Sequence, residues 1–140
     1  MNSRRQARIT AYETLYQRSF LNEYAPGEKY LLLSSGLEGK NLAYGKVITE
    51  LAWKHREFAE ETMRVLSERN VHAIRTVKAL GWLTINEMVH CPETDHGIVI
   101  NEALEICKSH VGAKYVPYFN VLLDRVYKTH RLRQANLLKK

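Results

Sequence analysis

The stretch GIVINEALEICKSHVGAKYVPYFNVLLDRV, from Gly97 to Val126, decides the fold of this chain. Its first half has apolar residues at i, i+3, i+4 and i+7, the spacing of one buried stripe on a helix. These positions are Ile100, Ala103, Leu104 and Cys107. Gly112 stands where that helix would end, and Pro117 stands where another would begin. The helical period then resumes at Phe119, Leu122, Leu123 and Val126. The stretch therefore predicts two helices hinged at Gly112.

Similar helical patterns occupy the N-terminal half of the chain. Ser3 can cap a first helix that ends near Phe20, and its core-facing stripe consists of Ile9, Tyr12, Leu15 and Tyr16. A short helix is expected at residues 28–35, before two glycines. Residues 42–67 keep a period of about 3.6 residues. One long helix would satisfy this period, and so would two helices with a break near residues 54–56.

A core helix is expected next, capped by Asn70, running to Val89 and stopped by Pro92. Thr94 or Asp95 would cap the helix that follows it. Strand signals are nearly absent, because the chain has no Asn-Gly or Asp-Gly turn and no sustained alternation of apolar and polar residues. The sequence predicts one all-α domain, residues 1–140, with six or seven helices.

Basic residues gather at both ends of the chain. Residues 1–8 hold three arginines and no acid, and residues 125–140 hold six lysines and arginines and no acid. All fifteen acidic residues lie between positions 9 and 124, where they outnumber the lysines and arginines. This asymmetry is typical of a protein that binds a polyanion. The alternative is that the arm (1–8) and the tail (about 128–140) are solvated ends without a partner.

Neither catalysis nor a cofactor is expected. Six potential metal ligands lie close together, but their spacing matches no standard zinc pair; they are His90, Cys91, Asp95, His96, Cys107 and His110. The chain has no phosphate-binding glycine loop and no nucleophile elbow. Trp53, beside three basic residues, is either a stacking platform for a base or an edge-of-core residue.

The chain is expected in the cytoplasm. It has two cysteines and no secretory apolar segment, so reduced thiols are the default. No apolar run approaches the ~20 residues that a membrane helix requires, so no membrane contact is expected.

Two motifs in this chain resemble those of a known family. INEALEICKS followed by YFNVLLDRV resembles the C-terminal signature of the NusB family of transcription antitermination factors, and RRQARITAYETLYQ resembles the same family's opening pattern. The resemblance covers the first fifteen or so residues and roughly Ala79 to Val126. It implies a NusB-like bundle of two packed three-helix subdomains.

The resemblance also implies a binding function. Such proteins bind the boxA element of nascent single-stranded RNA together with NusE, a small-subunit ribosomal protein, in the RNA polymerase antitermination complex that supports rRNA transcription. The positions carried over for RNA binding are Arg4, Arg5, Arg8, Lys114, Tyr118 and Asn120. Tyr118 would stack on a base or belong to the core. Asn120 would bond a base, cap the last helix or, like Asn101, be a buried amide. Tyr16 remains available to the ribosomal partner. Monomer and homodimer both stay open.

Several positions depart from the family pattern. Val121 replaces a glycine, Gly81-Trp82 replaces a Leu-Arg pair, and Asn86 replaces a tyrosine before Glu87. Val77 stands where some members use a glutamate toward the ribosomal partner. Two other functions stay open: an RNA-binding module of an rRNA cytosine methyltransferase of the RsmB type, and a protein–protein adaptor. Asp124 favours the antitermination factor over the methyltransferase module, since the NusB-like module of the methyltransferase usually has arginine at this position.

Overall fold

The computed structural model describes residues 2–21, 35–67 and 69–138. The regular structure in these residues is entirely helical, which confirms the predicted all-α class. The α-helices are α1 (Arg4–Leu21), α3 (Gly39–Lys54), α4 (Arg56–Leu66), α5 (Arg75–His90), α6 (His96–Ile106) and α7 (Val116–Leu138). The short helix expected at 28–35 falls outside the described residues. No helix in the described part is long and apolar enough to span a membrane.

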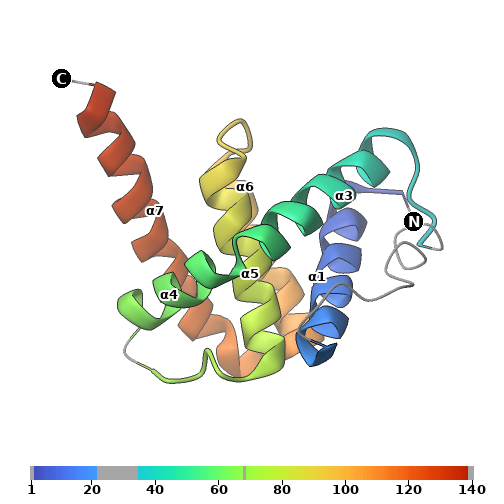
Figure 1. Ribbon diagram of the computed structural model, residues 1–140, viewed down its shortest axis with the longest axis horizontal. Coiled ribbons are helices and arrows are strands. Elements are labelled where there is room, and N and C mark those ends of the chain that lie inside the picture. The colour runs from blue at the N-terminus through green and yellow to red at the C-terminus, as the bar shows by residue number, and fades with distance from the viewer. Residues whose placement is uncertain (1, 22–34, 68, 139–140) are drawn as a thin grey trace.

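Helix α5 is the centre of the bundle. It runs through the middle of Figure 1, with α1 and α3 on one side and α4 and α7 on the other. It packs against α1, α3, α4, α6 and α7, and every residue from Ala79 to Met88 is buried. A helix that is buried on all sides must be covered by neighbours all round. The two groups of helices therefore share α5 as their common core.

Side-chain caps that the sequence predicts begin two of the helices, and a third predicted cap is not used. Ser3 Oγ accepts from the Gln6 backbone N–H at 3.0 Å, which confirms the predicted cap. Asp95 Oδ1 accepts from the Gly97 N–H at 3.1 Å. The predicted cap at Asn70 is wrong, because α5 begins at Arg75 and Ile74, which has no polar side chain, precedes it. Residues 71–74 instead form a turn closed by the backbone bond from Ile74 N–H to Val71 O, at 3.0 Å.

Residues 42–67 form two helices, which was one of the two possibilities left open by the sequence. Helices α3 and α4 are separated at His55. The side chain of Asn86 on α5 donates from Nδ2 to the His55 carbonyl oxygen at 3.2 Å. A tertiary contact therefore accompanies the break, and nothing in the periodicity of residues 42–67 indicates it.

The predicted hinge at Gly112 is confirmed. After α6 the chain widens into a π-helical turn, Cys107–Val111, which the Gly112 N–H closes by donating to Cys107 O at 2.7 Å. Gly112 has φ = 148°, in the region that favours glycine. A 3₁₀ turn, Ala113–Tyr115, leads into α7. The predicted α7 stripe is buried throughout, at 1% exposure or less: Phe119, Leu122, Leu123 and Val126.

Candidate nucleic-acid interface

The predicted arginine arm is the first two turns of α1, so its side chains have fixed places. Arg4 is exposed; its guanidinium lies 4.0 Å from the centroid of the Tyr44 ring, and Nη1 donates to the Lys40 carbonyl at 3.3 Å. Arg5 is also exposed and donates from Nε and Nη2 to the Glu102 carboxylate at 2.7 and 3.0 Å. That carboxylate raises the pKa of Arg5. Cations are unfavourable at a helix N-terminus, and here the compensating groups come from other helices.

Arg8 lies inside the protein, with only 4% of its surface exposed. Its Nε and Nη2 donate to both oxygens of the Glu87 carboxylate, the shortest contact being 2.8 Å. The Tyr44 hydroxyl donates to the same carboxylate and lies 3.4 Å from Thr94 Oγ1. Burial opposes the charge on Arg8, but Glu87 outweighs it, so the pKa of Arg8 lies above its ordinary value. Burial and the Glu87 charge together raise the pKa of Tyr44.

This buried network joins α1, α3 and α5 beneath the exposed arginines. Sequence reasoning placed Arg8 with Arg4 and missed Glu87 and Tyr44. A signal was available, because Arg8 precedes Tyr12 by four residues and Leu15 by seven, the spacing of the buried stripe. A cation on a buried stripe requires a buried acid. Glu87, on the fully buried helix, meets that requirement.

The hinge carries two exposed polar residues from the predicted set. Lys114 lies in the 3₁₀ turn, with Nζ 5.2 Å from the centroid of the Tyr115 ring. Asn120 is exposed on α7, and Asn101 is exposed on α6. The interpretation of these asparagines as buried amides is therefore wrong. Neither amide has a side-chain hydrogen bond to the residues that the structure describes, so both are open to a ligand.

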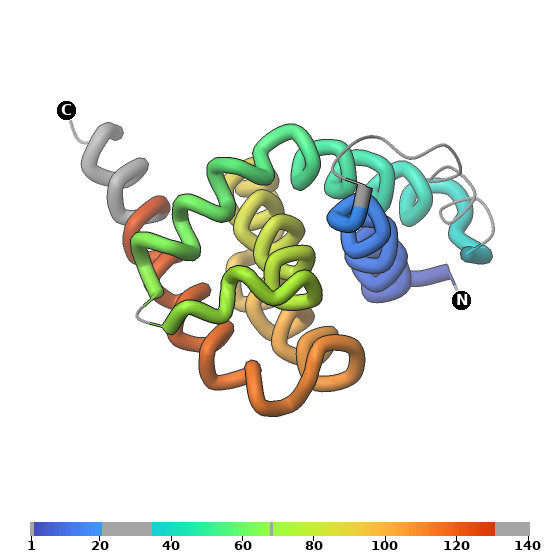
Figure 2. Tube along the Cα trace, turned by 60° about the horizontal axis from the view of Figure 1, so that its bottom comes forward, coloured from blue at the N-terminus to red at the C-terminus, as the bar shows by residue number. Residues whose placement is uncertain are grey.

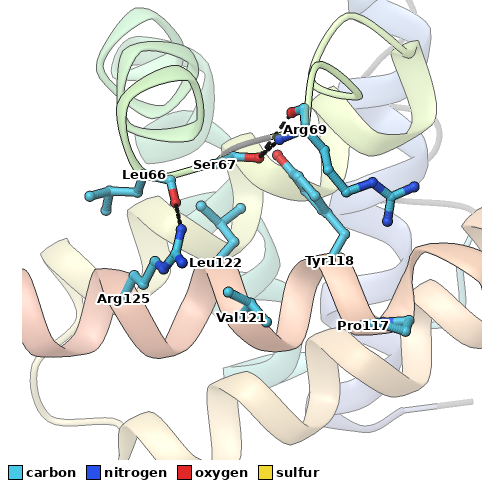
Figure 3. Close-up of a pocket in the computed structure, with 8 residues that line it drawn as sticks. All are labelled: Leu66, Ser67, Arg69, Pro117, Tyr118, Val121, Leu122 and Arg125. Atoms are coloured by element: carbon cyan, nitrogen blue, oxygen red, sulfur yellow. Dashed lines mark hydrogen bonds between the residues drawn. The ribbon is translucent and has the colours of Figure 1, made fainter.

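A groove of about 360 Å³ lies between the end of α4 and the start of α7 (Figure 3). It is lined by Leu66, Ser67, Arg69, Pro117, Tyr118, Val121, Leu122 and Arg125. Tyr118 is 5% exposed and forms one wall. Its hydroxyl points toward Ser67 but makes no hydrogen bond of good geometry within the described residues, and burial raises its pKa. Val121, which replaces the family's glycine, is 50% exposed on the rim of the groove.

Two arginines of this groove were missed from the sequence. Arg125 Nη1 donates to the Leu66 carbonyl at 2.7 Å and so ties α7 to the end of α4. Arg69 is exposed in the segment between α4 and α5. Arg125 follows Tyr118 by seven residues, which places both on one face of α7. That spacing was the signal available in the sequence.

Tyr16 lies in a row of aromatic rings along α1. It is half-buried, with its ring 6.3 Å from that of Tyr12 and 5.0 Å from that of Phe20, centroid to centroid. Phe20 is 55% exposed, and the Arg75 guanidinium lies 4.6 Å from its ring centroid. The row therefore ends in an apolar and cationic surface. Val77, by contrast, is fully buried and presents no group to a partner.

The two basic regions do not form a single patch. The N-terminal end of α1 lies on one side of the molecule, and the end of α4 with the start of α7, which line the groove, lies on the other, in both views (Figures 1 and 2). The α7 residues after the groove lie on that second side as well. Arg4 and Arg5 are therefore separated from Tyr118, and an RNA that contacts both must cross the body of the protein.

Trp53 and the potential metal ligands take up contacts within the fold. Trp53 is half-buried, 5.8 Å from the Trp82 ring and 3.9 Å from the Arg56 guanidinium, which favours the edge-of-core interpretation. His96 stacks on Tyr127 at 3.7 Å. Cys91 and Cys107 are buried thiols, and burial raises the pKa of each to about 11. No group of three possible ligands in the described part could hold a metal ion.

Comparisons with known proteins agree with the resemblance. The NusB family model matches residues 4–128. The chain is 34% identical over 133 residues to the transcription antitermination protein NusB of Burkholderia ambifaria, covering 89% of this chain and 88% of that protein. It is 30% identical over 128 residues to the NusB protein of Ralstonia nicotianae, covering 89% and 82%. The structure of T. maritima NusB superposes with a TM-score of 0.77 at 20% identity, covering 93% and 94% of the two chains.

Proposed function

The chain belongs to the NusB family, and on this premise we propose that it is a transcription antitermination factor that binds boxA-like single-stranded RNA. Its partners in this proposal are NusE, the small-subunit ribosomal protein, and the RNA polymerase antitermination complex that supports rRNA transcription. The role is binding and not catalysis. The curated relatives are named transcription antitermination proteins.

The observation that carries the proposal is the pair of exposed arginines on an anchored helix start. Arg4 and Arg5 stand at the N-terminus of α1, where the helix dipole also favours an anion. Arg8 beneath them is engaged by Glu87 and holds the helix in place. Phosphate contacts therefore fall to Arg4 and Arg5, while Arg8 positions them. Phosphate contacts of this kind fix the register of a nucleic acid on its protein.

The hinge and the groove form the second part of the proposed interface. Lys114 and Asn120 are exposed and supply a cation and a base-reading amide. Tyr118 belongs to the core, and its ring shapes the groove instead of standing free for a base to stack on. Single-stranded RNA is flexible enough to run from one side of the protein to the other.

The salt dependence of RNA binding tests this assignment. The double variant Arg4→Ala/Arg5→Ala should bind more weakly than the wild type, and its salt slope should be shallower by ~0.7 for each lost phosphate contact. Arg64→Ala is the matched control, because Arg64 is also exposed and paired with a glutamate, on α4. An unchanged slope in the double variant would remove Arg4 and Arg5 from the interface.

The aromatic row on α1 is the proposed surface for the ribosomal protein. Phe20 is the exposed end of that row, and Tyr16 supports it. The variant Phe20→Ala should weaken binding of NusE without loss of folding, as measured by calorimetric titration together with thermal melting. Retained affinity in a folded variant would place the partner elsewhere.

A further inference from the structure

Two histidine rings stack beside the C-terminal end of α5, and a third histidine lies on the neighbouring helix α7. His55 lies at the break between α3 and α4, His90 is the last residue of α5, and His130 is in α7. The rings of His55 and His90 stack with centroids 4.2 Å apart and an interplanar angle of 23°. The ring of His130 meets Phe58 edge-on at 5.6 Å, and its charge acts on His90.

Asn86 builds this cluster. Its Nδ2 donates both to the His55 carbonyl at 3.2 Å and to the Trp82 carbonyl at 2.9 Å, and the residue is fully buried. His90 follows Asn86 by one helical turn, so its ring is brought up to that of His55.

The charged groups that lower the pKa of His90 are all cationic. Burial lowers the pKa of His90, and His55, His130 and Lys54 lower it further. Two stacked imidazoles repel each other when both are protonated. An anion placed among them would remove this repulsion, and its binding would be accompanied by proton uptake near neutral pH. His90 is exposed and the other two rings are half-exposed, so such an anion has access.

Helix α3 links the cluster to the exposed arginines. Its first turn carries Lys40, whose carbonyl accepts from Arg4, and its last residue, Lys54, precedes His55. Sixteen residues of helix span about 24 Å. Tyr44, under Arg4, contacts Glu87, three residues before His90 on α5. Arg4 and the stacked histidines thus lie near opposite ends of α3.

We propose that His55 and His90 form a pH-dependent contact for a phosphate group of RNA that runs along α3 from Arg4. The assignment of the anion to RNA rests on the proposed function above. The contact strengthens as the pH falls, because the imidazoles bind phosphate in their protonated form. It extends the interface from the start of α1 toward α7.

Imidazole NMR titrations with and without a short boxA-like single-stranded RNA test this proposal. The pKa of His90 should rise by about one unit when RNA is bound, which makes binding several-fold tighter at about pH 6 than at about pH 8. The limit is about tenfold, reached only when the pH lies well below the pKa of His90 in the free protein. The variants His90→Gln and His55→Gln should each flatten this pH dependence. His110→Gln is the control, because His110 lies apart with Ser109 and Tyr12, and it should keep the dependence.

Three other results of these titrations would overturn the proposal, each for a different reason. RNA that binds while the imidazoles of His55 and His90 keep their free pKa values would overturn the histidine contact and leave the proposed function standing. RNA that fails to bind at either pH would overturn both. Inorganic phosphate that shifts His90 when RNA does not would make the cluster a site for a small anion instead.

Discussion

Replacing Glu87 with glutamine is the sharpest test of how the fold holds its candidate interface. The change keeps the shape of the side chain and removes its charge. Arg8, at 4% exposure, would then be a buried cation without a counter-ion, and the Tyr44 hydroxyl would lose a charged acceptor. Breaking a buried pair by removing one partner costs about 3–5 kcal/mol. For a chain of this length that corresponds to a fall in Tm of roughly 10–20 °C.

Urea unfolding followed by circular dichroism measures this cost, since the midpoint gives the free energy of unfolding when the slope m is unchanged. Glu61→Gln is the control, because Glu61 forms an exposed pair with Arg64 and should leave the midpoint in place. The double variant Arg8→Met/Glu87→Met should recover most of the loss, since apolar residues of similar volume often replace a buried pair without penalty. A loss below about 1 kcal/mol for Glu87→Gln, or a double variant no better than the single one, would refute this reasoning.

Three further outcomes are expected. Gly112→Ala should lower the free energy of unfolding by about 1–3 kcal/mol, because φ = 148° is strained for any residue with a Cβ; an unchanged urea midpoint would contradict this. Tyr118→Phe should leave the free energy of unfolding unchanged or raise it, because it removes a buried hydroxyl that has no good partner among the described residues. Tyr118→Ala should lower the free energy of unfolding by about 3–5 kcal/mol, because it also removes the ring from the core. Equal melting temperatures for Tyr118→Phe and Tyr118→Ala would contradict the assignment of the Tyr118 ring to the core. Cys91 and Cys107 should react with a thiol reagent at pH 8 only after unfolding, because a pKa of about 11 leaves about one thiol in a thousand ionised; rapid labelling of the native protein would show the thiols to be accessible.

The sequence predicted the parts of the fold that local rules decide. The stripe ending in Cys107, the hinge at Gly112 and the stripe beginning at Phe119 all follow from helical spacing and backbone preference. The cap at Ser3 follows from a single hydroxyl and the N–H three residues later. These features need no knowledge of what lies across the core.

Features that depend on distant contacts were not predictable in this way. The break at His55 is accompanied by a bond from Asn86 on another helix. The start of α5 follows the turn at residues 71–74 instead of the good capping residue at Asn70. Arg8 looks like a surface arginine until its buried partner is known. For Asn120 both a base contact and a buried amide stayed open, because its position on α7 does not by itself reveal which face of the helix is covered.

The measurement that tests the central claim most directly is a fluorescence-anisotropy titration of boxA-like single-stranded RNA against a scrambled RNA of equal composition. It should be run over a salt series, with NusE present and absent. We expect the protein to prefer boxA by about tenfold or more, which is roughly 1.4 kcal/mol, and its binding to depend steeply on salt. Equal and steeply salt-dependent binding of both RNAs would contradict it, leaving a basic scaffold and favouring a protein–protein adaptor.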